Sequence, residues 1–307
     1  MNINDPLDAA TIAVIAIAGM GLLGGALFAI ARRGHAGGLA PRTALARAGS
    51  YAGLAVAITA AARAGVPGIA GLIAILGSIG IVEWARLFDL PRHHRLSMLA
   101  GNVVLVVAVA IAGGAAADWL VGGLVLVGAA WPVIRADTGR AIRDLGFAAV
   151  GFLVVPVLLV HAVALAVELH GAGIALFVAL AVACAGSDVG AFVIGRTFGH
   201  LPLAPRLSPN KTRAGVVGNI VGAAVGLALF TPALVPTFGV GFVAALVPIV
   251  AAGSVWGDLL ESAVKREAHV KDAGDWLPGF GGILDRIDSL LITVALAYWT
   301  LRILAAL

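Results

Sequence analysis

The chain has 307 residues, of which 61% are hydrophobic and only 12% are charged. A soluble domain has about a quarter of its residues charged, so this composition, with a mean hydropathy of +1.05, excludes a soluble protein and indicates many membrane spans. The single cysteine, Cys184, lies in an apolar run, which excludes a disulfide framework and a thiolate metal site within one chain.

Apolar runs of about 20 residues, the length that crosses a bilayer as a helix, recur along the chain. The first run follows Asp5 and Asp8 rather than a basic segment and is too long for a signal-peptide core, so we expect a retained membrane helix. We predict an all-α, polytopic transmembrane bundle of about ten spans, at residues 9–31, 48–62, 66–84, 98–117, 119–134, 145–167, 173–194, 215–235, 237–256 and 287–306.

The lysines and arginines test this topology independently. All but two of the 20 lie in alternate loops, after the first, third, fifth, seventh and ninth predicted spans; the exceptions are Arg63 and Arg302. Because basic residues accumulate on the cytoplasmic side of a membrane, we expect these loops in the cytoplasm and both termini outside. The same bias explains the pI near 9.8 without a nucleic-acid partner. We therefore expect a multi-pass protein of the inner (plasma) membrane.

Polar residues are divided unevenly along the chain. Residues 1–144 have short loops with few carboxylates, whereas residues 145–307 contain two long polar loops, 195–214 and 257–286. We interpret the first part as N-terminal transmembrane helices and the second as a transmembrane catalytic region. In the second part glycines recur every fourth residue, which predicts a helix face that a neighbouring backbone approaches closely: Gly218, Gly222 and Gly226.

The last polar loop carries carboxylates at helical spacing. If the ninth span continues as a helix beyond the membrane, Asp258, Glu261 and Lys265 lie along one face. After a turn rich in glycine and proline, the next helix begins with Asp285 and Asp288, again three residues apart. Oxygen ligands of this kind suit Mg²⁺, which takes one or two carboxylates together with water and substrate phosphates. An ordinary interfacial loop, whose acids and bases solvate one another, explains the spacing equally well.

Asp188 lies near the cytoplasmic end of the seventh predicted span. An ionisable group costs about 3 kcal/mol at mid-membrane, so such residues usually have a function; the alternative is a helix-end aspartate in water. Beyond it, residues 203–215 bring together Ser208, Lys211 and Thr212 between prolines. The segment lacks the glycine-rich run and the Gly-Lys pair of a P-loop, but Lys211 is well placed to bind phosphate.

At these residues the chain resembles the integral-membrane CTP:phosphatidate cytidylyltransferases, also called CDP-diacylglycerol synthases. The family's pattern runs Ser-x-x-Lys-Arg-x4-Lys-Asp-x-small-x2-aliphatic-Pro-Gly-His-Gly-Gly-x-x-Asp-Arg-x-Asp. The matching residues are Ser262, Lys265, Arg266, Lys271, Asp272, Gly274, Leu277, Pro278, Gly279, Gly281, Gly282, Asp285, Arg286 and Asp288. The stretches around Asp188, Lys211 and Asp258 also look like the family's. In the first half of the chain the resemblance rests on hydropathy and on the pair Glu83-Trp84.

The resemblance implies a reaction and a set of roles. The phosphate of phosphatidate attacks the α-phosphorus of CTP, giving CDP-diacylglycerol and pyrophosphate for phospholipid biosynthesis, with Mg²⁺ as cofactor and room for a second metal ion. The expected metal ligands are Asp258, Asp285, Glu261 and Asp288. The expected catalytic residues are Asp258, Asp285, Lys265 and Arg286. The expected substrate-binding residues are Asp188, Ser208, Lys211, Arg266, Lys271, Gly281 and Gly282.

The same resemblance sets the expected surroundings of the site. We expect a polar cavity on the cytoplasmic side, membrane lipid around it, no nucleic acid as a partner and a homodimer as a candidate assembly.

The chain departs from the family's pattern in two places. Phe280 stands where the family has a histidine before the Gly-Gly pair, and Arg213-Ala214 stand where Trp-Glu usually follows the Lys-Thr pair. Phenylalanine neither titrates nor donates a hydrogen bond, so a histidine contact to phosphate is absent. Three alternatives stay open: a cytidylyltransferase for another lipid phosphate, a non-catalytic relative, and a transporter on the same fold. A transporter is expected to have charged residues at the midplane of several spans, whereas here the charge is concentrated in two loops.

Overall fold

The computed structural model describes residues 41–135, 139–270, 273–274 and 281–306. The predicted first span, 9–31, lies outside these residues. The helices are α2 (Pro41–Arg63), α3 (Gly65–Leu87), α4 (Arg92–Ala112), α5 (Ala115–Arg135), α6 (Ala141–Phe152), α7 (Leu158–Glu168), α8 (His170–Phe198), α9 (Arg213–Ala228), α10 (Thr231–Glu267) and α11 (Leu284–Ala306). A short π-helical segment, η1 (Leu153–Val157), joins α6 to α7, and the strands are β1 (Pro202–Ala204) and β2 (Ser208–Thr212).

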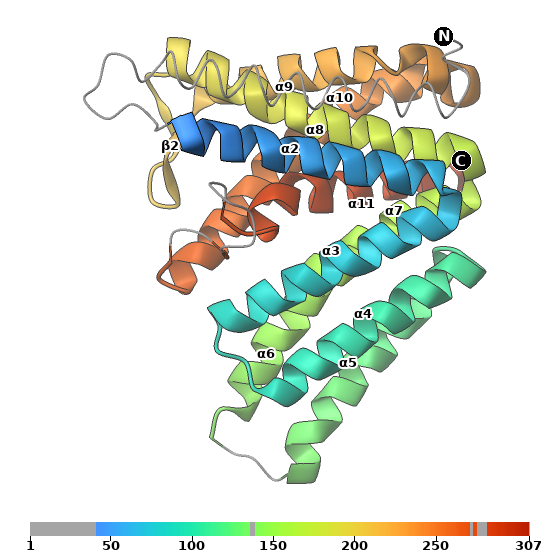
Figure 1. The fold of residues 1–307 in the computed structure, drawn as a ribbon, viewed down its shortest axis with the longest axis vertical. Helices are drawn as coiled ribbons and strands as arrows, with labels where there is room; N and C mark the ends of the chain where they lie inside the picture. Colours follow the sequence, from blue (N-terminus) through green and yellow to red (C-terminus); the bar gives the residue numbers. More distant parts are fainter. Residues whose placement is uncertain (1–40, 136–138, 271–272, 275–280, 307) are drawn as a thin grey trace.

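The helices form two adjoining groups (Figure 1). In one group α2, α8, α9 and α10 run roughly parallel to one another, with α11 packed against α10. In the other, α3, α4 and α5 lie beside the continuous helix formed by α6, η1 and α7. The groups meet where α3 and α7 contact α8 and α11, and the largest fully buried side chains, among them Phe177, Leu180 and Leu159, lie in this common core.

Six helical segments among the described residues are long and apolar enough to cross a membrane. They are Gly65–Leu87, Arg92–Ala112, Ala141–Glu168, His170–Phe198, Thr231–Glu267 and Leu284–Leu304. There are also three shorter apolar helical stretches, Ala52–Arg63, Ala115–Ala130 and Arg213–Ala228. A membrane protein built from helices is therefore confirmed. Each predicted apolar run after the first overlaps a described helix, but the runs 98–117 and 215–235 each extend across a turn into the next helix.

Some boundaries differ from the prediction. The predicted run 215–235 is too long, because α9 ends at Ala228 and a short turn at Leu229 and Phe230 separates it from α10. α10 continues as a helix to Glu267, well past the apolar run, and contains one break at Gly239, whose φ of 77° favours glycine. Hydropathy alone could not reveal this extension, because its last turns are polar.

A two-stranded hairpin adds strand structure that the all-α prediction did not include. β1 and β2 pair antiparallel between α8 and α9. The hairpin ends in a helix cap, since the Thr212 side chain accepts a hydrogen bond from the Gly215 N–H at 3.1 Å at the start of α9. The cap fixes the hairpin directly to the helix that follows it.

The predicted glycine face is confirmed. A Cβ added at Gly218 would meet the backbone of Gly190, and one added at Gly222 would meet the backbone of Gly186. At Gly226 it would lie 2.7 Å from the Cα of Ala183. Because glycine allows this approach, α9 lies directly against α8 and carries the hairpin to the end of the bundle where α10 becomes polar.

Candidate active site

α10 and α11 cross at close range where the polar residues lie. A Cβ added at Gly257 would meet the carbonyl oxygen of Asp288, and one added at Gly253 would meet Thr293. Any larger residue at these positions would force the helices apart. The crossing therefore brings the polar end of α10 against the first turns of α11.

Lys265 lies between two carboxylates, and the three residues are called here the lysine cluster (Glu261, Lys265 and Asp285). Its Nζ atom is 2.7 Å from Oε2 of Glu261 and 2.9 Å from Oδ1 of Asp285. The other oxygen of Asp285, Oδ2, accepts hydrogen bonds from the backbone N–H groups of Gly282 (2.7 Å) and Ala273 (3.1 Å). Only 4% of the Asp285 side chain is exposed, so its charge is neutralised by Lys265 and by backbone dipoles rather than by bulk water.

Three aspartates form a second group, called here the aspartate group (Asp188, Asp258 and Asp288). Asp258 of α10 is ion-paired with Lys211 of β2. Asp188 of α8 lies within charge–charge range of Asp258, Lys211 and Arg286. Asp288 of α11 interacts with Asp258 and lies within range of Asp188. Carboxylates gathered in this way repel one another, which favours a bound cation between them.

Asp188 also lines a small pocket. The residue is exposed, and Leu76, Arg286 and Ser289 line the same pocket of about 60 Å³. An ionised group there needs a partner of opposite charge, and Arg286 and Lys211 are the basic side chains within range.

A polar cavity of about 640 Å³ adjoins the aspartate group. Its walls come from α8, the hairpin, α9 and α10, and they include Arg196, His200, Lys211, Asn219 and Asp258. The volume lies in the range of sites that hold a small-molecule ligand. Lys211 and Asp258 thus stand at the boundary between this cavity and the aspartate group.

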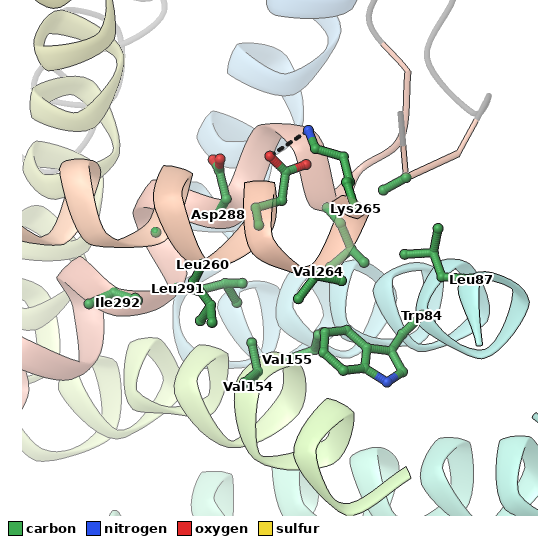
Figure 2. A pocket seen from close by; sticks show the side chains of 14 residues that line it. Trp84, Leu87, Val154, Val155, Leu260, Val264, Lys265, Asp288, Leu291 and Ile292 are labelled. Carbon is green, nitrogen blue, oxygen red and sulfur yellow. Dashed lines mark hydrogen bonds and ion pairs between the residues drawn. The ribbon is translucent and has the colours of Figure 1, made fainter. Parts of the chain in front are cut away.

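A small, mostly apolar pocket of about 30 Å³ is lined in part by Glu261 and Lys265 of the lysine cluster. Figure 2 shows Lys265 and Asp288 along one side of this pocket, with Leu291, Val154 and Val155 on the opposite side. Charged and apolar side chains thus line this pocket together.

The remaining predicted residues fall in different surroundings. Arg266 donates from Nε to the carbonyl oxygen of Leu207 at 3.4 Å, which links the end of α10 to the hairpin that contains Ser208. Gly281 has a φ of 87°, a conformation that favours glycine, so its place in the motif has a conformational reason. Lys271 and Phe280 lie outside the described residues.

Glu83 is a site residue that sequence reasoning missed. It is fully buried near the end of α3, and its two carboxylate oxygens accept hydrogen bonds from the N–H groups of Ile283 and Leu284, both at 2.8 Å. The available signal was weak: a glutamate followed by Trp84 at the polar end of an apolar run. Nothing in the spacing indicated that α3 reaches a loop 200 residues further along the chain.

No ready-made metal cage is found among the described residues: no three His, Cys, Asp or Glu side chains there converge as a ligand set. One observation nevertheless fits a cation, since the buried Oε1 atom of Glu261 has no hydrogen-bond partner. A site that offers one or two carboxylates and leaves other positions to water and phosphate is the usual arrangement for Mg²⁺.

Fold and site together define a polytopic helical membrane protein with acidic and basic residues collected at one end of the bundle. Residues 46–304 match the model of the cytidylyltransferase family. The chain belongs to this family.

Individual relatives agree over the C-terminal part. The chain is 45% identical over 115 residues to a phosphatidate cytidylyltransferase of Brucella suis, covering 36% of this chain and 41% of the relative. It is 44% identical over 130 residues to the enzyme of that name from Haemophilus influenzae (41% and 44% covered). It is 39% identical over 128 residues to a phosphatidate cytidylyltransferase of Mycobacterium leprae, covering 41% of this chain and 40% of the relative. The matches therefore span about two fifths of the length of these curated relatives.

The lysine cluster predicts a large loss of stability when its cation is removed. Lys265→Met leaves two carboxylates facing each other, and breaking a buried ion pair in this way costs about 3 to 5 kcal/mol. We expect a clearly lower unfolding midpoint in detergent for Lys265→Met, and a partial recovery in Lys265→Met/Glu261→Gln.

A matched control uses an exposed ion pair. Asp89 pairs with Arg140 at 3.8 Å, and its side chain is 92% exposed, so Asp89→Asn should change stability by less than about 1 kcal/mol. Equal midpoints for Lys265→Met and Asp89→Asn would show that the lysine cluster contributes no more than a surface pair.

Proposed function

We propose that this protein transfers CMP from CTP to phosphatidate, giving CDP-diacylglycerol and pyrophosphate. The observation that carries the proposal is the position of the Lys211–Asp258 ion pair in the wall of a polar cavity of about 640 Å³, within charge–charge range of Asp188 and Asp288. Family membership and the names of the relatives support the same reaction. The partners are CTP, phosphatidate and the surrounding lipid, with a homodimer as the assembly to test.

The proposed chemistry is an in-line displacement at phosphorus. An oxygen of the lipid phosphate forms a bond to the α-phosphorus of CTP, the bond from that phosphorus to the oxygen bridging to the β-phosphate breaks, and pyrophosphate leaves. The nucleophile is already an anion, so the protein needs no strong base. Its tasks are to align two anions and to neutralise the charge that develops between them.

The basic residues are assigned to the phosphates. Lys211 and Arg286 lie within charge–charge range of the aspartate group, and Lys265 lies at the α10–α11 crossing. We assign these three to the reacting phosphates, with Ser208, Arg266 and Lys271 binding the outer part of CTP. Asp188 would orient Lys211 and Arg286 toward the substrates.

The acidic residues are assigned to a metal. Mg²⁺, when bound, would neutralise phosphate oxygens and stabilise the leaving pyrophosphate. The candidate ligands are Asp258, Asp285, Asp288 and Glu261, of which one or two would hold the ion together with water and substrate phosphates. Glu261 is included because its Oε1 atom lacks a hydrogen-bond partner. In the structure described here, Lys211 and Lys265 neutralise Asp258 and Asp285.

The proposal includes an orientation in the inner membrane, with about ten spans and the site facing the cytoplasm. The hairpin, the α3–α4 turn and the start of α11 all lie toward one side of the bundle, on the left in Figure 1, and the loops there are rich in arginine and lysine. A cysteine at the exposed Asn210, in a Cys184→Ala background, should react with an impermeant thiol reagent only from the cytoplasmic side. Labelling in intact cells would contradict this orientation.

A different lipid phosphate is the second candidate substrate, and the departures from the family's pattern are the reason. Arg213 is exposed at the first position of α9, so replacement of the family's Trp-Glu alters the surface beside the cavity. Phe280 removes a histidine contact to phosphate. Both changes leave the lysine cluster and the aspartate group intact.

A transfer assay tests the proposal. Purified protein in detergent, given labelled CTP, Mg²⁺ and a panel of lipid phosphates, should form lipid-linked CMP, with phosphatidate as the best acceptor. An excess of chelator should abolish the product. Asp258→Asn should lower the rate by at least about 100-fold, because it removes a proposed ligand of the metal.

The matched control is Asp89→Asn, which removes an exposed carboxylate outside the site. It should retain the wild-type rate. Full turnover in chelator, or equal rates for Asp258→Asn and Asp89→Asn, would contradict the proposed role of the aspartates.

A further inference from the structure

Glu83 connects two helices that are far apart in the sequence. Its carboxylate, with no exposed surface, accepts hydrogen bonds from the N–H groups of Ile283 and Leu284. These groups lie at the start of α11, where a helix has N–H donors without carbonyl partners. A carboxylate there also interacts favourably with the helix dipole. Glu83 of α3 is therefore an N-terminal cap supplied to α11 from another helix.

Two described glycines before α11, Gly274 and Gly282, lie close to this carboxylate. A Cβ added at Gly274 would lie 2.5 Å from Oε1 of Glu83, and one added at Gly282 would lie 2.7 Å from both carboxylate oxygens. At such distances an added Cβ would require the Glu83 carboxylate to shift away from the N–H groups that it accepts from. Gly274 and Gly282 of the C-terminal motif therefore pack against Glu83, which lies outside the motif.

The cap is coupled directly to the lysine cluster. The N–H of Gly282 donates to Oδ2 of Asp285, and the next two N–H groups along the chain donate to Glu83. Three successive backbone donors are therefore divided between the two carboxylates. A shift of this segment would move Asp285 relative to Lys265, which Asp285 contacts through its other oxygen.

We propose that Glu83 is a positioning residue for the transfer reaction, holding residues 282–284 so that Asp285 and Lys265 keep their places in the site. The inference rests on the proposed function, because it assigns Glu83 a role through Asp285. Glu83 itself contacts the backbone of α11, so its effect is on the geometry of the site rather than on affinity for CTP.

The first test compares Glu83→Gln with Glu168→Gln. Glu168 is a matched control, because it also accepts a backbone hydrogen bond, from Gly114 at 2.8 Å, and one from Tyr298 Oη at 2.9 Å, outside the site. Glu83→Gln should lower kcat about 10- to 100-fold, with KM for CTP changed by less than about threefold. Glu168→Gln should leave both near the wild-type values.

The second test is a double-mutant cycle with Gly274. Gly274→Ala should lower kcat in the wild-type background, because the new methyl group meets Glu83. In a Glu83→Ala background that neighbour is gone, so adding Gly274→Ala should have little further effect. Additive losses in the cycle, or a change confined to KM, would overturn the proposal.

Hydrogen exchange separates this inference from the proposed function. In the absence of substrate, Glu83→Gln should accelerate amide exchange in peptides covering 281–290, with exchange in α8 and α9 unchanged. If the wild type transfers no CMP, the proposed function is wrong. The hydrogen-exchange result then still tests whether Glu83 stabilises the start of α11. Unchanged exchange in 281–290, or faster exchange throughout the protein, would overturn the positioning role.

Discussion

Charge neutralisation at the crossing of α10 and α11 is the constraint on which the site depends. The Nζ atom of Lys265 forms ion pairs with both Glu261 and Asp285, within 2.9 Å of a carboxylate oxygen of each. Removing one partner of a buried ion pair destabilises a protein by more than the intact pair stabilises it, because an uncompensated charge stays buried. The backbone around Glu261, Lys265 and Asp285 must therefore hold these three side chains in place. Gly253 and Gly257 meet this requirement by letting the two helices touch.

The other elements bring further charges to the same place. The glycine face of α9 on α8 carries the hairpin to the polar end of the bundle, where Lys211 reaches Asp258. The result is a polar cavity of about 640 Å³ with Lys211 and Asp258 in its wall. In the proposed function the soluble nucleotide binds in this cavity.

The sequence predicts what is periodic or local. Hydropathy located the described helices, and the fourfold glycine spacing identified the α8–α9 contact. Helical spacing also aligned Asp258, Glu261 and Lys265 on α10, which the polar continuation of that helix confirms. What could not be predicted depends on contacts between distant segments. Two such features are the capping of α11 by Glu83 and the separation of the carboxylates into two groups. Both depend on how the helices cross, which residue spacing in the sequence does not predict. The assigned roles remain predictions.

Position-specific labelling tests the central claim, nucleotidyl transfer, most directly. With CTP labelled at the α-phosphate, the account predicts that the lipid product carries the label and that pyrophosphate appears in equal amount. With CTP labelled at the γ-phosphate, all label should remain in pyrophosphate. Label from the γ-phosphate in the lipid would instead show phosphoryl transfer, and no lipid label from either position would show that this site does not perform the reaction.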